Sequence, residues 1–182
     1  MRIIAGEWRG RPIAAPKGDT TRPTADRTRE ALFSMLLSRV GSFEGMTIAD
    51  MFAGSGALGL EALSRGASHC LFVEQDKAAL DALKANIAKL QAGARSKVAP
   101  QSVLTLGAAP RPYDIILMDP PYNSGAGAVA LDKLTRLGWI GDASWVSIET
   151  ARGEDVNVNG YVADTVRDIG KARIHLLQRI RA

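Results

Sequence analysis

Apolar positions along the chain recur in two different periods, which predict strands and helices in turn. Short apolar runs predict strands at 47–53, 70–74, 96–100, 113–119 and 144–150. Apolar residues at helical spacing predict helices at 57–65, 76–92 and 128–138. Because strands and helices exchange regularly, we expect parallel strands joined by right-handed crossovers. The expected fold is an open, doubly wound α/β sheet, in which ligands bind beyond the carboxyl ends of the strands.

The two ends of the chain follow other patterns. Residues 2–16 hold two short apolar runs around a centre rich in glycine and arginine, which predicts a small β-hairpin. Thr24 is expected to cap a helix that continues to Val40, with Asp26 in its first turn. Extended segments near 161–167 and 172–180, separated by Gly170 and Lys171, predict a closing antiparallel hairpin. These patterns divide the chain into an N-terminal basic hairpin extension, 1–20, and a single domain, 21–182.

Composition narrows the class of protein. The chain has 182 residues, of which 46% are hydrophobic and 23% charged, as in one ordinary globular domain. One cysteine, Cys70, excludes an internal disulfide, and two histidines with one cysteine exclude the usual four-ligand zinc site. No apolar run approaches about 18 residues, and the N-terminus lacks the apolar core of a signal peptide. We expect a cytoplasmic monomer without metal.

Basic residues concentrate at the two ends. Residues 1–30 hold seven basic and four acidic side chains, and residues 167–182 hold five and one, whereas residues 31–166 hold eleven and fourteen. This distribution fits a polyanion-binding edge, although solvated tails would give the same pattern. Aromatic residues make up only 5% of the chain, which disfavours a broad base-stacking platform. Arginine suits phosphate, and the candidate phosphate contacts are Arg2, Arg9, Arg11, Arg22, Arg27 and Arg29.

A glycine loop follows the first predicted strand. Gly54, Gly56 and Gly59 match G-x-G-x-x-G between a strand and a helix, and Glu74 ends the next strand 20 residues after Gly54. Such glycines allow close backbone approach to a nucleoside, whose ribose hydroxyls an acidic residue at the next strand end can hold. Asp50, four positions before the first glycine, would repel a pyrophosphate and suit a ligand with an ammonium group. The pattern therefore favours S-adenosylmethionine over NAD.

A second motif, Asp119-Pro120-Pro121-Tyr122, follows the apolar run at 113–118. Successive prolines restrict the backbone and remove two N–H donors, so the Pro120 carbonyl is presented rigidly beside the Asp119 side chain. These two acceptors can hold both hydrogens of an amino group, while Tyr122 stacks on the ring that carries it. Orientation of the amine lone pair towards an electrophile is most of what a methyl transfer needs.

The glycine loop, Glu74 and the Asp119–Tyr122 motif resemble those of class I S-adenosylmethionine-dependent amino-methyltransferases. The opening RIIAGEWRGR and the block RPTADRTREALFSML at 22–36 are similar to the bacterial 16S ribosomal RNA guanine-N2 methyltransferases, the family named for guanine 966 and often called RsmD. The resemblance implies a Rossmann-like sheet of seven strands with an N-terminal hairpin for RNA, and small-subunit ribosomal RNA, free or in an assembling 30S particle, as substrate. It implies catalysis by Asp119, Pro120, Pro121 and Tyr122. The expected cofactor contacts are Asp50, Phe52, Ala53, Gly54, Gly56, Glu74, Gln75, Ser102 and Val103.

One departure from the family pattern lies after the third strand. Ser102 stands where the family usually has Asp or Asn to hold the adenine amine, and Gln101 is a possible substitute. The Asp119–Tyr122 motif does not distinguish guanine from adenine or cytosine, so a DNA or RNA adenine or cytosine amino-methyltransferase is the main alternative. An NAD-dependent oxidoreductase and a non-enzymatic RNA-binding protein are the others.

Overall fold

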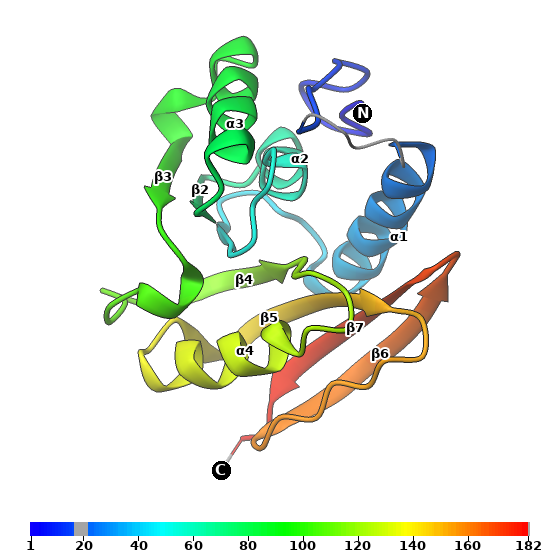
Figure 1. The fold of residues 1–182 in the computed structure, drawn as a ribbon, viewed down its shortest axis with the longest axis vertical. Coiled ribbons are helices and arrows are strands. Elements are labelled where there is room, and N and C mark those ends of the chain that lie inside the picture. Colours follow the sequence, from blue (N-terminus) through cyan, green and yellow to red (C-terminus); the bar gives the residue numbers. More distant parts are fainter. Residues whose placement is uncertain (17–21, 182) are drawn as a thin grey trace.

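Seven strands form one sheet with helices on both faces (Figure 1). The computed structural model describes residues 1–16 and 22–181, with the backbone alone for residues 22–24. The α-helices are α1 (Arg22–Val40), α2 (Ala57–Ser64), α3 (Lys77–Lys89) and α4 (Ala126–Arg136), and short 3₁₀ turns are η1 (Gly93–Arg95) and η2 (Val103–Thr105). The strands are β1 (Thr47–Asp50), β2 (His69–Glu74), β3 (Ser96–Pro100), β4 (Tyr113–Met118), β5 (Ile140–Ala151), β6 (Tyr161–Ile169) and β7 (Ala172–Arg179).

The strand order is β3-β2-β1-β4-β5-β7-β6. The first five strands in the chain pair in parallel, whereas β7 runs antiparallel to both β5 and β6. The expected mostly parallel sheet with a C-terminal hairpin is therefore confirmed. Parallel pairing places the carboxyl ends of β1, β2, β4 and β5 along one edge of the sheet, and a ligand site is expected there.

Each face of the sheet is covered by its own hydrophobic cluster. Helices α1, α2 and α3 pack on one face, where Phe33, Leu60 and Leu83 are buried. Helix α4 and the turn η2 cover the other face with Leu131, Val103 and neighbouring apolar side chains. Alternate residues of β4 point into opposite clusters, as the two-residue period of a strand requires. No helix among residues 22–181 is long and apolar enough to cross a membrane.

The N-terminal segment, residues 1–16, packs onto the domain. It forms a minimal hairpin with one antiparallel bridge between Arg2 and Pro12. Its apolar side chains Ile3, Trp8 and Ile13 are buried in the same cluster as α2 and α3. Trp8 packs with the Arg95 guanidinium 5.0 Å from its ring centroid, so its side chain serves packing rather than base stacking. The expected division of the chain at residue 20 falls outside the described residues.

Two boundaries differ from the sequence prediction. Helix α1 begins at Arg22, so Thr24 lies inside the helix and does not cap it. Pro23 is compatible with this start, because the missing N–H of proline costs nothing in the first turn of a helix. Strand β5 begins at Ile140, earlier than the apolar run indicates, because Tyr113 pairs with Ile140 before an irregularity in the ladder.

Candidate active site

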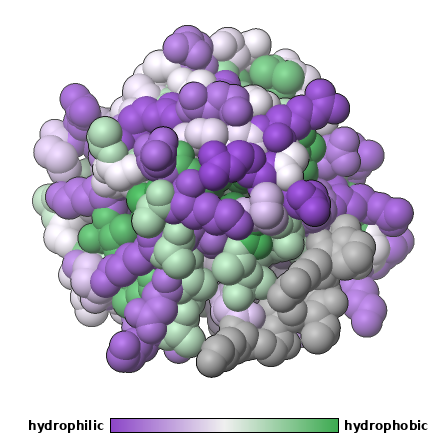
Figure 2. All heavy atoms as spheres, turned by 90° about the horizontal axis from the view of Figure 1, so that it is seen from above, coloured by the Kyte–Doolittle hydropathy of each residue, from purple (hydrophilic) through white to green (hydrophobic). Residues whose placement is uncertain are grey.

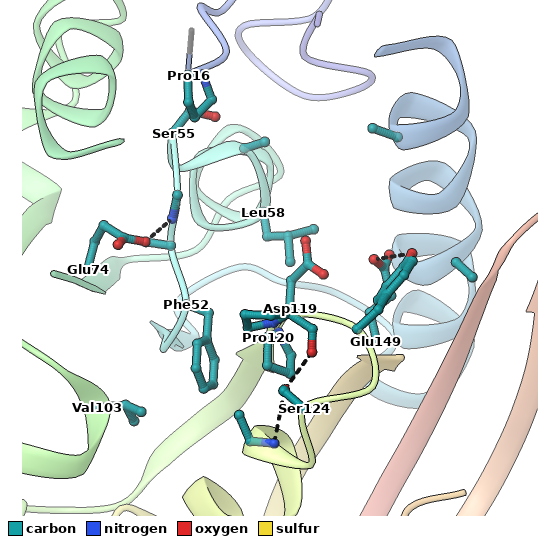
Figure 3. Close-up of a pocket in the computed structure, with 18 of the residues that line it drawn as sticks. Pro16, Phe52, Ser55, Leu58, Glu74, Val103, Asp119, Pro120, Ser124 and Glu149 are labelled. Carbon is teal, nitrogen blue, oxygen red and sulfur yellow. Dashed lines mark hydrogen bonds between the residues drawn. The ribbon is translucent and has the colours of Figure 1, made fainter. Parts of the chain in front are cut away.

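A cavity of about 1080 Å³ opens at the carboxyl edge of the sheet. It is lined by segments that are far apart in the sequence: α1, the glycine loop, the end of β2, the turn η2, the loop after β4, the end of β5 and the turn between β6 and β7. Figure 3 shows Glu74 on one side of this space, and Asp119 and Glu149 on the other, with Phe52 and Pro120 between them. The edge expected from the strand order is therefore hollow.

The glycine loop follows β1 and forms one wall of the cavity. Gly54 has a left-handed φ of 56°, and its N–H donates to Oε1 of Glu74 at 2.8 Å. Nothing lies within 4 Å of the position that a Cβ on Gly54 would occupy, so the backbone is open to a ligand. Phe52 and Ala53 also line the cavity. This stretch of backbone can approach a bound nucleoside closely.

The other two glycines of the motif serve packing. Gly56, an expected cofactor contact, does not line the cavity. A Cβ on Gly56 would lie 2.4 Å from Cδ1 of Leu83, and a Cβ on Gly59 would lie 2.3 Å from Cε1 of Phe72. Both glycines therefore let α2 approach α3 and β2, and the expected contact of Gly56 with a ligand is wrong.

Asp50 is also absent from the cavity wall. Its side chain is 1% exposed, and its Oδ2 accepts a hydrogen bond from the N–H of Gly59 at 3.0 Å. Its other oxygen, Oδ1, is buried without a hydrogen-bond partner. Burial raises the pKa of Asp50 to about 7; the Gly59 N–H opposes this shift and the Glu74 charge adds to it. The expected contact of Asp50 with a ligand ammonium group is wrong, because α2 lies over the carboxylate.

Glu74 ends β2 and faces the cavity with its orientation held by backbone donors. Oε1 accepts the Gly54 N–H, and Oε2 accepts the N–H groups of Gln75 and Asp76 at 2.9 and 2.8 Å. Gln75 lines the same wall. A carboxylate held in this way can accept a hydroxyl hydrogen without first being ordered.

The segment after β3 contributes Ser102 and Val103. Oγ of Ser102 accepts the N–H of Leu104 at 3.2 Å and so caps the turn η2, while its hydroxyl hydrogen can still be donated. Gln101 does not line the cavity, because its side chain donates to Oγ1 of Thr105 at 3.1 Å. Of the two alternatives considered for the adenine contact, only Ser102 reaches the cavity.

The Asp119–Tyr122 motif forms the opposite wall, and all four of its residues line the cavity. The Tyr122 hydroxyl donates to Oε2 of Glu149 at 3.1 Å. Burial and the neighbouring Glu149 carboxylate raise the pKa of Tyr122, so the hydroxyl stays protonated and remains a donor. The loop is held further along, where Asn123 adopts a left-handed φ of 58° and donates its N–H to Oε2 of Glu154 at 3.0 Å. Contacts outside the motif therefore hold its shape.

Sequence reasoning missed several residues of this wall. Thr28 of α1, Glu149 at the end of β5, and Lys171 in the β6–β7 turn all line the cavity. A signal for Glu149 was available, since it lies near the end of a predicted strand, as Asp119 does. No local pattern indicates that α1 or the last turn reaches the site.

Four of the six candidate phosphate contacts are exposed: Arg2, Arg9, Arg11 and Arg27. Figure 2 looks onto the end of the molecule that carries the N-terminal segment, and hydrophilic residues cover most of that face. The side chain of Arg22 lies outside the described residues. Arg29 is a correction: it is 3% exposed and forms ion pairs with Glu61 at 3.3 Å and Asp26 at 3.1 Å. A guanidinium that is buried and paired in this way cannot serve as a surface phosphate contact.

Comparison with known proteins gives consistent matches across the chain. Residues 1–178 match the protein family described as Conserved hypothetical protein 95. The chain is 38% identical over 150 residues to "Ribosomal RNA small subunit methyltransferase D" of Escherichia coli (strain K12), covering 82% of this chain and 74% of that protein. It is 35% identical over 156 residues to the protein of the same name from Haemophilus influenzae, covering 84% and 79%. A solved structure of the Escherichia coli protein yhhF superposes with a TM-score of 0.84 at 33% identity, covering 100% of this chain and 99% of that one.

Proposed function

Because the chain belongs to the ribosomal RNA small subunit methyltransferase D family, we propose that it methylates the exocyclic N2 amine of a guanine in small-subunit ribosomal RNA, with guanine 966 of 16S RNA as the target. Its cofactor is S-adenosylmethionine. The relatives of this chain are methyltransferases, which argues against an NAD-dependent oxidoreductase and against a non-enzymatic RNA-binding protein. We place the reaction in the cytoplasm, where ribosomal RNA is assembled.

One observation carries the proposal: a single cavity is shared by the glycine loop with Glu74 and by the Asp119–Tyr122 motif. Its volume of about 1080 Å³ lies at the upper end of the range of roughly 300–1,000 Å³ for small-ligand pockets. The space therefore suits a cofactor and a base together. Bringing the two into one cavity converts a bimolecular encounter into a reaction between positioned groups.

The residues on the cofactor side fit S-adenosylmethionine. Glu74 would accept hydrogen bonds from the ribose, and the open backbone at Gly54 would lie against the ligand. The Ser102 hydroxyl can donate to a ring nitrogen of the adenine. When bound, the cofactor supplies an electrophilic methyl group on its sulfonium.

The residues on the substrate side orient the amine. The Asp119 side chain and the Pro120 carbonyl accept the two amine hydrogens, which turns the nitrogen lone pair towards the methyl group. The Tyr122 ring stacks on the base. As nitrogen gains positive charge, the Asp119 carboxylate stabilises it by an interaction that strengthens in the transition state. The target base must be unstacked to reach the cavity, so a loop or an exposed junction is the expected RNA site.

The test is methyl transfer with radiolabelled S-adenosylmethionine to 16S RNA and to assembled 30S subunits, followed by nucleoside identification. We expect label in N2-methylguanosine. Label in N6-methyladenosine or N4-methylcytidine would instead support the adenine or cytosine alternative. Absence of label from both substrates would contradict the proposal.

A further inference from the structure

Glu149 lies beside Asp119 at the edge of the sheet. On the parallel strands β4 and β5, Met118 is paired with Ile148, and Asp119 and Glu149 are the next residue on each chain. Neighbouring strands run about 4.8 Å apart, and residues in the same register point to the same face. Met118 and Ile148 are buried together in the cluster under α4. The following residues therefore point to the opposite face, where α1 lies, and Figure 3 shows both carboxylates there.

The tyrosine between these two acids orients Glu149. The Tyr122 hydroxyl donates to Oε2 of Glu149, while Glu149 is half-buried and lines the cavity. A carboxylate has about four acceptor positions, so this bond leaves Oε1 able to accept a hydrogen from a ligand. The motif thus presents two carboxylates side by side at the edge of its aromatic ring.

The hydrogen-bonding edges of the bases differ at the atom next to the reactive amine. In guanine this atom is N1, which carries a hydrogen, so the N2 amine and N1 form a row of donors. In adenine and cytosine the corresponding ring nitrogen carries a lone pair. A second carboxylate beside the amine site would accept from the guanine N1–H and would repel the lone pair of the other two bases. A site with buried polar groups rejects an analogue that leaves them unpaired.

We propose that Glu149 is the specificity residue of this site and accepts the N1–H of the target guanine, while Asp119 and the Pro120 carbonyl accept its amine hydrogens. This inference rests on the proposed function, since it needs a base in the cavity. It assigns to Glu149 a role that the Asp119–Tyr122 motif alone cannot fulfil, because that motif accepts any amino group.

The experiment compares two RNA substrates that differ only at the target position, one with guanine and one with 2-aminopurine. 2-Aminopurine keeps the amine on C2, but its N1 has a lone pair in place of the hydrogen. The measured quantity is the ratio of kcat/KM on guanine RNA to kcat/KM on 2-aminopurine RNA. Losing a hydrogen bond to a charged group costs about 10–100-fold, so Glu149→Ala should lower the ratio by that factor. Glu149→Gln should also lower it, because its amide can donate to N1 of 2-aminopurine.

Two further variants separate this role from a structural one. If Glu149 only held the Tyr122 ring, Tyr122→Phe would lower the ratio as much as the Glu149 variants do; we expect it to keep the wild-type ratio. Glu154→Gln is the matched control, because Glu154 holds the loop through Asn123 but does not line the cavity. It should slow both substrates alike.

The outcomes distinguish the inference from the proposed function. A wild-type ratio in folded, cofactor-binding Glu149→Gln overturns the role of Glu149 and leaves the proposed function intact. A drop in Tyr122→Phe equal to that in Glu149→Gln also overturns it. A wild-type protein that methylates neither RNA overturns the proposed function, and this inference with it.

Discussion

At the scale of single residues, two carboxylates that end neighbouring strands have opposite surroundings. Asp119 is exposed on the cavity wall, whereas Asp50 is buried behind α2. Sequence pattern alone gives both residues the same status, as an acid at a strand end. Their surroundings assign Asp119 to the chemistry and Asp50 to the architecture of the loop, and each assignment has its own test.

Asp119 is expected to act as a hydrogen-bond acceptor for the amine. Asp119→Ala should then lower turnover by about 10²–10⁴-fold, the range for a positioned polar catalytic group. Asp119→Asn should be milder, because its amide oxygen still accepts. Single-turnover methylation of one RNA by the two variants measures the difference. If Asp119→Asn is as inactive as Asp119→Ala while it remains folded and binds cofactor, a charge or proton-transfer role must replace this account.

Asp50 should make stability fall as pH rises. Its pKa is raised to about 7 by burial, above the value of about 3.9 expected in the unfolded chain. Between these values the native state keeps a proton that the unfolded state has lost. The contribution of Asp50 to the free energy of unfolding therefore decreases by about 1.4 kcal/mol per pH unit in this window and is constant above it.

Denaturant unfolding of the wild type and of Asp50→Asn between pH 5 and pH 8 checks this prediction. The wild type should lose stability relative to Asp50→Asn as pH rises towards 7. A difference between the two proteins that stays constant across this range would show that Asp50 is already ionised in the folded protein at pH 5.

At the scale of elements, one buried carboxylate joins the N-terminal segment to two helices. Glu61 of α2 is fully buried and accepts the backbone N–H groups of Ile4 and Ala5 at 2.9 and 3.1 Å. It also pairs with Arg29 of α1 and with Arg65, at 3.3 and 2.9 Å. Deletion of residues 1–15 would therefore expose apolar side chains and leave Glu61 with fewer partners. It would test folding as much as RNA binding.

Glu61→Ala should lower the free energy of unfolding by about 3–5 kcal/mol, the cost of removing one partner of a buried ion pair. The control is Asp132→Ala, which removes an exposed pair with Arg136 on α4 and should cost less than about 1 kcal/mol. Urea unfolding of both variants gives the comparison. Similar small losses in the two would contradict a structural role for the Glu61 network.

At the scale of the whole molecule, basic residues concentrate near the termini, while acidic residues surround the amine site. Glu149, Asp119 and Glu154 all add negative charge around Tyr122. This environment favours the hydrogen-bond donors of a base and repels phosphates. We therefore expect the RNA backbone to contact exposed arginines of the N-terminal segment and α1, away from the cavity floor.

The double variant Arg9→Ala, Arg27→Ala should weaken RNA binding and reduce its salt dependence. Each phosphate contact contributes about 0.7–0.9 to the slope of log K against log salt, so the slope should fall by roughly 1.4–1.8. Arg136→Ala, on the helix across the sheet, is the matched control and should leave the slope unchanged. Equal slopes in all three proteins would remove these arginines from the RNA contact.

The sequence by itself determined the order of the elements and the two motifs. Strand and helix periods are local, and so are the glycine turn and the proline pair, so these features can be read without tertiary contacts. The placement of Glu74 and Asp119 at one edge also followed from the sequence, because parallel strands bring their carboxyl ends together.

Only the tertiary structure decided which residues of these motifs face the cavity. Asp50 and Gly56 belong to the glycine motif, yet α2 covers the first and Leu83 packs on the second. Arg29 belongs to a basic stretch, yet Glu61, 32 residues away, pairs with it. Glu149 reaches Asp119 through strand pairing between distant segments. Burial and pairing depend on contacts between segments far apart in the chain, and a local sequence pattern carries no information about them.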